Sequence, residues 1–184
     1  MAVQLNGHTA ALNGDTSLRS PMRLYFLRHG DASIGGFSSD SERPLSSEGV
    51  AEIESVRNAV RLMNLNFTHI LASPLVRTQE SARIIVTLFP SISVQPCEHL
   101  TPTSDPQNLF RELRPFPRDS RILFVSHEPF VSRCISSLIS VNSDSKISIK
   151  KAALACLEAG SPPQRGAGIL LWILTPDQMI HMRQ

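Results

Sequence analysis

Four residues that could bind and transfer a phosphoryl group follow apolar segments of the chain, where turns are expected: Arg28, His29, Arg77 and His127. Guanidinium groups form paired hydrogen bonds with phosphate oxygens, and a neutral imidazole can attack phosphorus through one nitrogen. Positive charge nearby disfavours the protonated imidazole, so Arg28 would help to keep His29 neutral. Gly30 gives the turn after His29 its backbone freedom. These residue types predict a site for a tetrahedral dianion, with His29 as the nucleophile.

Phosphoryl transfer at such a site depends on positioning and on fixed positive charge, and it requires no metal ion. The sequence lacks the spacing of His, Cys, Asp or Glu that is typical of zinc sites. We therefore expect neither a metal nor another cofactor.

The three cysteines, Cys97, Cys134 and Cys156, contain no C-x-x-C pair, and none precedes an arginine at the distance that a cysteine-dependent phosphatase loop requires. They are expected to be buried apolar side chains. An odd number of cysteines without a disulfide framework favours a reducing compartment, and we expect a cytoplasmic protein.

Strands that alternate with helices are expected to position the four residues. The hydrophobic periodicity predicts strands over residues 22–27, 68–72, 92–94, 121–125, 152–157 and 169–174, and helices over 48–63, 75–88, 107–113 and about 129–140. This order predicts a single α/β domain over residues 21–184, built as a three-layer sandwich. A central, mostly parallel sheet is flanked by helices, with a minimal cap subdomain or none. Ligands of such sheets bind at the carboxyl ends of the strands, where the four residues lie.

Residues 1–20 lack both a basic start and a continuous apolar run, and we expect a flexible N-terminal tail rather than a secretory signal. Their Ser, Thr and Ala content leaves organellar targeting open. The formal net charge is only +2, which disfavours a nucleic-acid-binding protein. No segment is long and apolar enough to predict a membrane span.

The ordered motifs resemble the histidine phosphatase superfamily, which includes the phosphoglycerate mutases and is named for its Arg-His-Gly motif. Residues 24–32 are similar to the first strand and nucleophile of the family, 43–45 to the segment after the next loop, 73–78 to the second arginine motif, and 125–127 to the second histidine. The resemblance implies that His29 accepts the phosphoryl group while Arg28, Arg77 and His127 hold it. Arg43 is a candidate for substrate binding, with local pairing as the alternative.

Within the superfamily, the sequence is most similar to the short SixA-type phosphohistidine phosphatases. These share Arg-His-Gly-Asp-Ala, a Leu-Thr-Pro stretch like residues 100–102, and a proline two residues after the second histidine, like Pro129. The resemblance implies a protein phosphohistidine as the substrate, with a histidine phosphotransfer domain as the expected partner. The short interval between Arg77 and His127 also leaves little room for a cap, and an uncapped site can admit a side chain of another protein.

The general acid is the position at which the chain departs from the family. Where the family often has a glutamate before such a stretch, this chain has Glu98-His99, so Glu98 or His99 could take the role, or the role could be absent. Two alternatives therefore stay open. One is a phosphatase of the same superfamily that acts on a small phosphate ester, and the other is a phosphate-binding module without catalysis.

Overall fold

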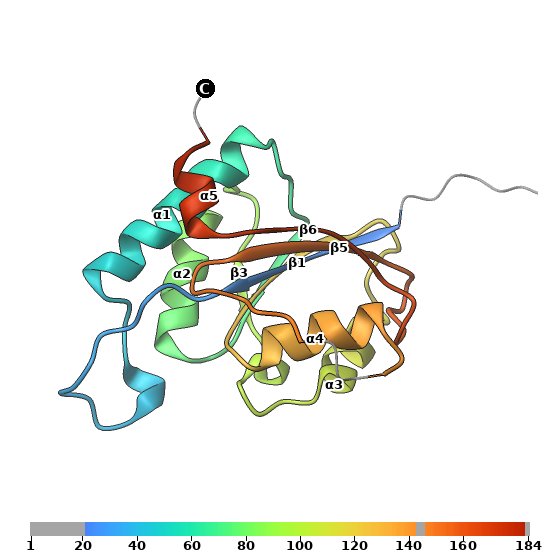
Figure 1. The fold of residues 1–184 in the computed structure, drawn as a ribbon, viewed down its shortest axis with the longest axis horizontal. Helices are drawn as coiled ribbons and strands as arrows, with labels where there is room; N and C mark the ends of the chain where they lie inside the picture. Colours follow the sequence, from blue (N-terminus) through green and yellow to red (C-terminus); the bar gives the residue numbers. More distant parts are fainter. Residues whose placement is uncertain (1–20, 143–145, 183–184) are drawn as a thin grey trace, which may run out of the picture.

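The computed structural model describes residues 21–142 and 146–182, so the predicted tail at residues 1–20 lies outside the described part. Its centre is a six-stranded sheet in the order β3-β2-β4-β1-β5-β6 (Figure 1). The strands are β1 (Met22–Arg28), β2 (His69–Ala72), β3 (Val94–Pro96), β4 (Arg121–Ser126), β5 (Leu154–Ala159) and β6 (Ile169–Leu174). The first four run parallel, whereas β5 is antiparallel to β1 and β6 to β5. The prediction of a mostly parallel sheet is confirmed.

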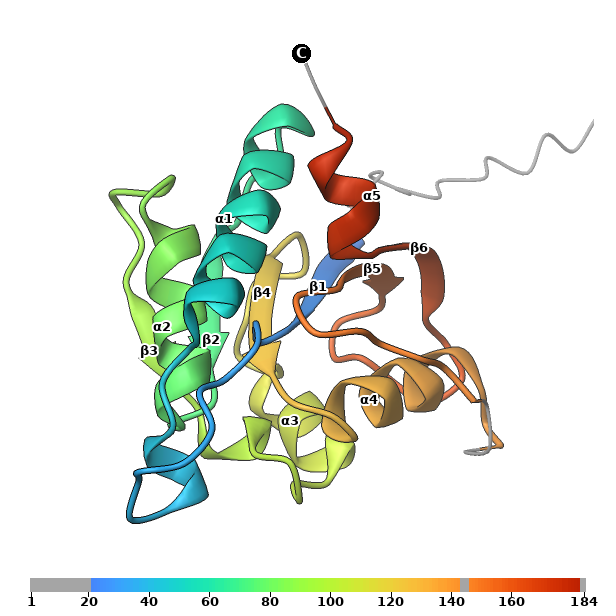
Figure 2. The ribbon, with the colours of Figure 1, turned by 60° about the vertical axis from the view of Figure 1, so that its left-hand side comes forward.

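Helices cover both faces of the sheet, as Figure 2 shows. One face carries α1 (Ser47–Leu62), α2 (Val76–Val86) and α5 (Pro176–Ile180), and the other carries α3 (Pro106–Glu112) and α4 (Phe130–Ile139). Within the described ranges, the helices outside these layers are two single 3₁₀ turns, η1 (Asp40–Glu42) and η2 (Glu98–Leu100). The three-layer α/β fold with a minimal cap agrees with the sequence.

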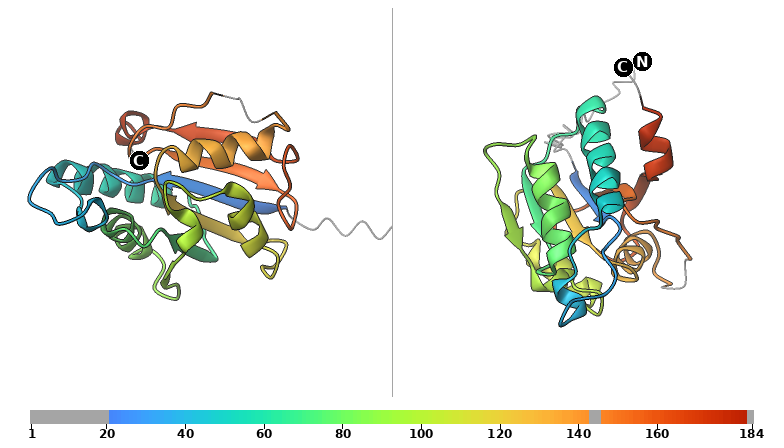
Figure 3. Two further views of the ribbon diagram at one scale, coloured as in Figure 1. Left: turned by 90° about the horizontal axis from the view of Figure 1, so that it is seen from below. Right: turned by 90° about the vertical axis from the view of Figure 1, so that its left-hand side faces the viewer.

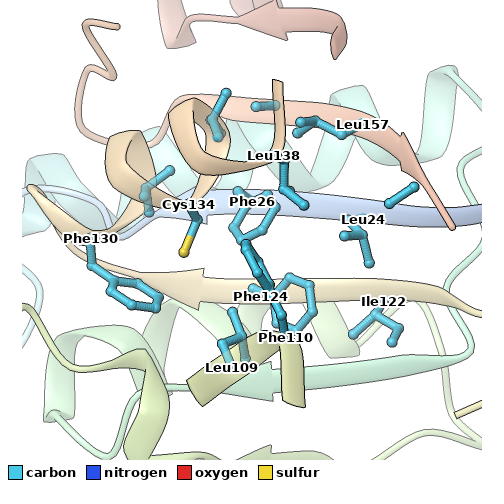
Figure 4. Packing of buried hydrophobic residues seen from close by; sticks show 14 of the residues in the cluster. Leu24, Phe26, Leu109, Phe110, Ile122, Phe124, Phe130, Cys134, Leu138 and Leu157 are labelled. Atoms are coloured by element: carbon cyan, nitrogen blue, oxygen red, sulfur yellow. The ribbon is translucent and has the colours of Figure 1, made fainter. Parts of the chain in front are cut away.

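The buried strand β1 supplies side chains to two apolar cores. Leu24 and Phe26 pack with α3 and α4, as Figure 4 shows, whereas Tyr25 and Leu27 pack under α1 and α2. Successive side chains of a strand point to opposite faces, so a strand covered on both faces is apolar at nearly every position. This explains why the site follows an unbroken apolar run.

Strand β5 and helix α5 differ from the prediction for local reasons. Strand β5 begins at Leu154 rather than at residue 152, because Ala152 has a φ of 52° and the chain turns there. The N–H of Ala152 donates to the carbonyl oxygen of His29 at 3.1 Å. Helix α5 was not predicted because its five residues are too few to show a helical period; a capping box between Thr175 and Gln178 starts it.

The register of the parallel strands brings their carboxyl ends together. Arg28 pairs with Ser126 and Ala72 with Val125, so the residues that follow β1, β2 and β4 emerge side by side. These residues are His29, Ser73 and His127. In Figure 1, the connection from β1 to α1, drawn in blue, extends beyond this edge of the sheet.

Candidate active site

His29 is held in one neutral tautomer. Only 9% of its surface is exposed, and Nδ1 lies 2.6 Å from the carbonyl oxygen of Gly30. A carbonyl oxygen can only accept, so Nδ1 carries the proton and donates it. Nε2 therefore holds a lone pair, and Nε of Arg77 donates to it at 3.2 Å. The unprotonated ring nitrogen thus faces a buried cation.

Burial is the main reason why both histidines of the site are neutral. The pKa of His29 is lowered to about 4, mainly by burial; the hydrogen bond to Gly30 opposes this shift, whereas Arg77, Arg28 and Lys151 add to it. Burial also lowers the pKa of His127 to about 3, with help from His29 and Arg77. The sequence indicated the charge effect of Arg28 on His29, but desolvation is the larger cause.

His127 and Arg28 each leave a buried polar atom unsatisfied. The rings of His127 and His29 lie 5.0 Å apart, and Nε2 of His127 is 2.9 Å from the hydroxyl of Ser73. Arg28 donates through Nη1 to the carbonyl oxygen of Ile149 at 2.8 Å. In the part of the chain that the structure describes, Nδ1 of His127 and Nε of Arg28 are buried without a hydrogen-bond partner. Because such groups are costly, an anionic ligand that engages both would stabilise this edge.

Arg77 is oriented by Asp40, a residue that the sequence did not single out. Arg77 is 6% exposed, and its Nη1 and Nη2 donate to the backbone oxygen and to Oδ2 of Asp40 at 2.6 and 2.8 Å. Asp40 thus accepts hydrogen bonds from the guanidinium edge that is formed by the two terminal nitrogens. The planar group then presents its other edge, which contains Nε, to His29. Arg43 and Arg77 lower the pKa of the Asp40 carboxyl.

Arg43 is paired locally, which is the alternative that the sequence left open. Its Nη1 donates to Oδ1 of Asp40 at 2.8 Å, and its Nε donates to the carbonyl oxygen of Ser33 at 2.8 Å. A third hydrogen bond joins Nη2 to the carbonyl oxygen of Ala32 at 3.3 Å. Arg43 therefore helps to hold in place the Asp40 carboxylate that orients Arg77.

The turn after His29 packs against the start of α1. A Cβ on Gly30 would lie 2.5 Å from the carbonyl oxygen of Gly49, so glycine is required by this close approach. The φ of Gly30 is not in the left-handed region, so the backbone freedom inferred from the sequence is not the reason. Asp31 accepts from the hydroxyl of Ser46, the N-cap of α1, at 2.7 Å and pairs with Lys151. Lys151, which the sequence also missed, thereby becomes fixed near His29.

Glu98 and His99 lie in the 3₁₀ turn η2. Nε2 of His99 is 3.4 Å from Oε1 of Glu112 in α3. Among the described residues, no hydrogen bond or ion pair joins either side chain to Arg28, His29, Arg77 or His127. A general-acid role for Glu98 or His99 stays a prediction.

Other sequence expectations concern cysteines, metals and membranes. Cys134 and Cys156 are buried, and burial raises the pKa of both thiols; Cys97 is half-buried. Within residues 21–142 and 146–182, no three His, Cys, Asp or Glu side chains are grouped so that they could hold a metal ion. None of the helices in these ranges has the length and apolar character needed to span a membrane.

The segment that carries three of the four predicted phosphate-binding residues matches a known protein family. Residues 24–101, which include Arg28, His29 and Arg77, match the histidine phosphatase superfamily (branch 1). Over this segment, the chain is similar to the histidine phosphatases.

Within the superfamily, the chain is similar to SixA. It is 25% identical over 160 residues to phosphohistidine phosphatase SixA of Escherichia coli strain K12, an alignment that covers 84% of this chain and 94% of that protein. The structure of protein histidine phosphatase SixA complexed with tungstate superimposes with a TM-score of 0.74 at 24% identity, over 85% of this chain and 98% of the other.

The fold is also shared with a phosphatase of a different substrate. A mutant phosphoserine phosphatase of Entamoeba histolytica, in complex with phosphoserine, superimposes with a TM-score of 0.65 at 15% identity, over 85% of this chain and 98% of that one. Fold likeness therefore does not define the substrate of this protein.

Proposed function

We propose that this protein is a phosphohistidine phosphatase that acts on proteins, with His29 as the nucleophile and Arg28, Arg77 and His127 as the phosphate-binding residues. The observation that carries the proposal is the neutral tautomer of His29, whose unprotonated Nε2 accepts from Nε of Arg77 at 3.2 Å. The similarity to SixA over most of both chains supports the substrate class. A histidine phosphotransfer domain is the expected partner.

In the first step, the Nε2 lone pair of His29 attacks phosphorus while the bond between phosphorus and the substrate imidazole breaks. The substrate histidine leaves with a proton on its ring and needs little help from a general acid. Arg28, Arg77 and His127 stabilise the charge on the phosphoryl oxygens.

In the second step, water attacks the phosphorylated His29, the bond between Nε2 and phosphorus breaks, and inorganic phosphate leaves. The attacking water passes a proton to phosphate or solvent. Throughout both steps, the hydrogen bond from Nδ1 to the carbonyl oxygen of Gly30 keeps the ring oriented and stabilises positive charge on the phosphorylated imidazole.

The connection between β1 and α1 favours a protein over a small molecule as the substrate. Ile34 is 94% exposed and Phe37 is also exposed, in the same connection whose Asp40 contacts Arg77. Exposed apolar side chains beside a site are typical of surfaces that contact another protein. We expect this connection to meet the protein that carries the phosphohistidine.

A substrate panel tests the proposal. Phosphate release is measured from a histidine-phosphorylated protein, from phosphoserine and from small phosphate esters under one set of conditions. Faster release from the phosphohistidine protein is expected. Fast turnover of an ester with none of the protein would favour the small-molecule alternative, which the fold likeness to a phosphoserine phosphatase motivates. Tungstate binding without any turnover would favour a non-catalytic phosphate-binding module.

A further inference from the structure

Four arginines line a cleft on the face of the molecule that carries α3 and α4. The cleft has two adjoining lobes, with volumes of about 240 and 340 Å³, that share Gln107 and Arg165. Arg111 and Arg114 line the first lobe and Arg133 lines the second. We call this feature the arginine cleft and define it by Arg111, Arg114, Arg133 and Arg165.

The residues that line the arginine cleft carry more positive than negative charge. All four arginines are exposed, and none is among the ion pairs found in the described residues. Asp105 is the one acidic residue among those lining the two lobes, and its Oδ1 accepts from the N–H of Gln107 at 3.0 Å as the N-cap of α3. The whole chain has a net charge of only +2, so the charge is concentrated locally. Such a cleft attracts anions.

Hydrogen bonds fix the walls of the arginine cleft. Gln107 of α3 donates to the hydroxyl of Ser137 in α4 at 3.2 Å, and the left view of Figure 3 shows the two helices side by side. The connection that carries Arg165 is tied to α4, because the N–H of Gly166 donates to the carbonyl oxygen of Ser137 at 3.0 Å. Buried Phe110 gives the cleft an apolar lining residue. The two lobes of the cleft therefore have room for more than a single ion.

We propose that the arginine cleft binds an acidic peptide segment of the protein substrate. Aspartate and glutamate carboxylates match the guanidinium fork, and the two lobes offer successive positions for them. Helix α4 begins shortly after His127, and Arg133 lies in its first turns, so the cleft extends from near the catalytic edge along the helix. That the peptide belongs to the substrate protein rests on the proposed function. That it is acidic rests on the charge of the cleft alone.

Binding of a fluorescently labelled octaglutamate peptide, followed by anisotropy at low salt, tests the chemistry. In a variant with both Arg133→Glu and Arg165→Glu, binding is expected to weaken by about tenfold or more. The matched control carries Arg61→Glu and Arg83→Glu, the same charge change at exposed positions of α1 and α2, and should change affinity by no more than about twofold. Unchanged turnover of a small phosphoramidate shows that each variant is folded.

Three results would overturn the acidic-peptide assignment: no octaglutamate binding by the wild type, an equal loss in both variants, or tighter binding of an octathymidylate than of octaglutamate. A variant with Arg133→Gln and Arg165→Gln repeats the test without added negative charge. Its affinity should fall between those of the wild type and the double glutamate variant.

A second measurement tests whether an acidic segment of the substrate binds in the cleft. The kcat/KM for a phosphohistidine peptide with six added glutamates is compared with that for the same peptide with six glutamines. The ratio is expected to be about ten in the wild type and near one in the Arg133→Glu, Arg165→Glu variant. Equal ratios in both proteins would overturn docking of the substrate in the cleft. If neither peptide were hydrolysed, the proposed function would fail, and octaglutamate binding would still decide whether the cleft takes acidic peptides.

Discussion

Replacing Asp40 with asparagine tests whether this carboxylate orients Arg77 for catalysis. The substitution removes a charge that pairs with both Arg77 and Arg43, but it leaves the 2.6 Å hydrogen bond from Arg77 to the backbone oxygen of residue 40. A hydrogen bond between charged groups contributes about 1.5–3 kcal/mol. Because the side chain of Asp40 is 62% exposed, solvent screening reduces this to about 1–2 kcal/mol. The expected loss in kcat/KM is therefore about 5- to 30-fold.

Steady-state kinetics of Asp40→Asn, Asp40→Glu and Glu42→Gln provide the assay. Glu42 is exposed in the same 3₁₀ turn, so its substitution is a matched control that should leave kcat and KM within about twofold of the wild type. Asp40→Glu should recover part of the lost kcat/KM, because it restores the charge. Equal activity of Asp40→Asn and the wild type, or an equal loss in Glu42→Gln, would refute the positioning role. Tighter tungstate binding by Asp40→Asn would show instead that Asp40 competes with phosphate.

Three further predictions follow from the surroundings of His29. The pKa values of about 4 for His29 and about 3 for His127 lie below the ordinary value of 6.5, so the unfolded chain binds more protons than the folded one between these values. The free energy of unfolding in urea should therefore fall as pH drops from 6.5 toward 4, and a constant value would contradict this prediction. The acid limb of kcat/KM should lie near pH 4. Gly30→Ala should lower the free energy of unfolding in urea by about 1–3 kcal/mol, because the new Cβ would lie 2.5 Å from the backbone of Gly49. An unchanged free energy of unfolding would disprove the clash. Lys151→Met should raise the pKa of His29 in an NMR titration whereas Lys150→Met should not, and identical titration curves would exclude the influence of Lys151.

The layers of the fold could be predicted from the sequence, because the spacing of apolar residues within one segment shows which strand or helix it forms. Every strand of the sheet was placed within about two residues, and β6 was placed at its observed bounds. Strand β3 begins two residues after the predicted start because the N–H of Ile92 closes a turn onto Phe89. Turns of this kind depend on hydrogen bonds that periodicity does not show.

The site was only partly predictable, because several of its contacts join distant segments. Motif residues at strand ends were identified, and the structure brings His29, Arg77 and His127 together. Asp40 was missed because its partner Arg77 lies far along the chain and nothing local shows the pairing. Lys151 was missed because its partner Asp31 lies far along the chain. The dominance of burial in the pKa of His29 likewise requires the packed structure.

Trapping of the phosphorylated enzyme tests the central claim most directly. The protein is mixed with a histidine phosphotransfer domain carrying radiolabelled phosphohistidine, and the reaction is quenched within milliseconds in alkaline denaturant, because phosphohistidine is labile to acid. We predict transient label on His29 of the wild type, and neither label nor phosphate release in a folded His29→Ala variant. Label on another residue, or phosphate release by His29→Ala at the wild-type rate, would contradict the account.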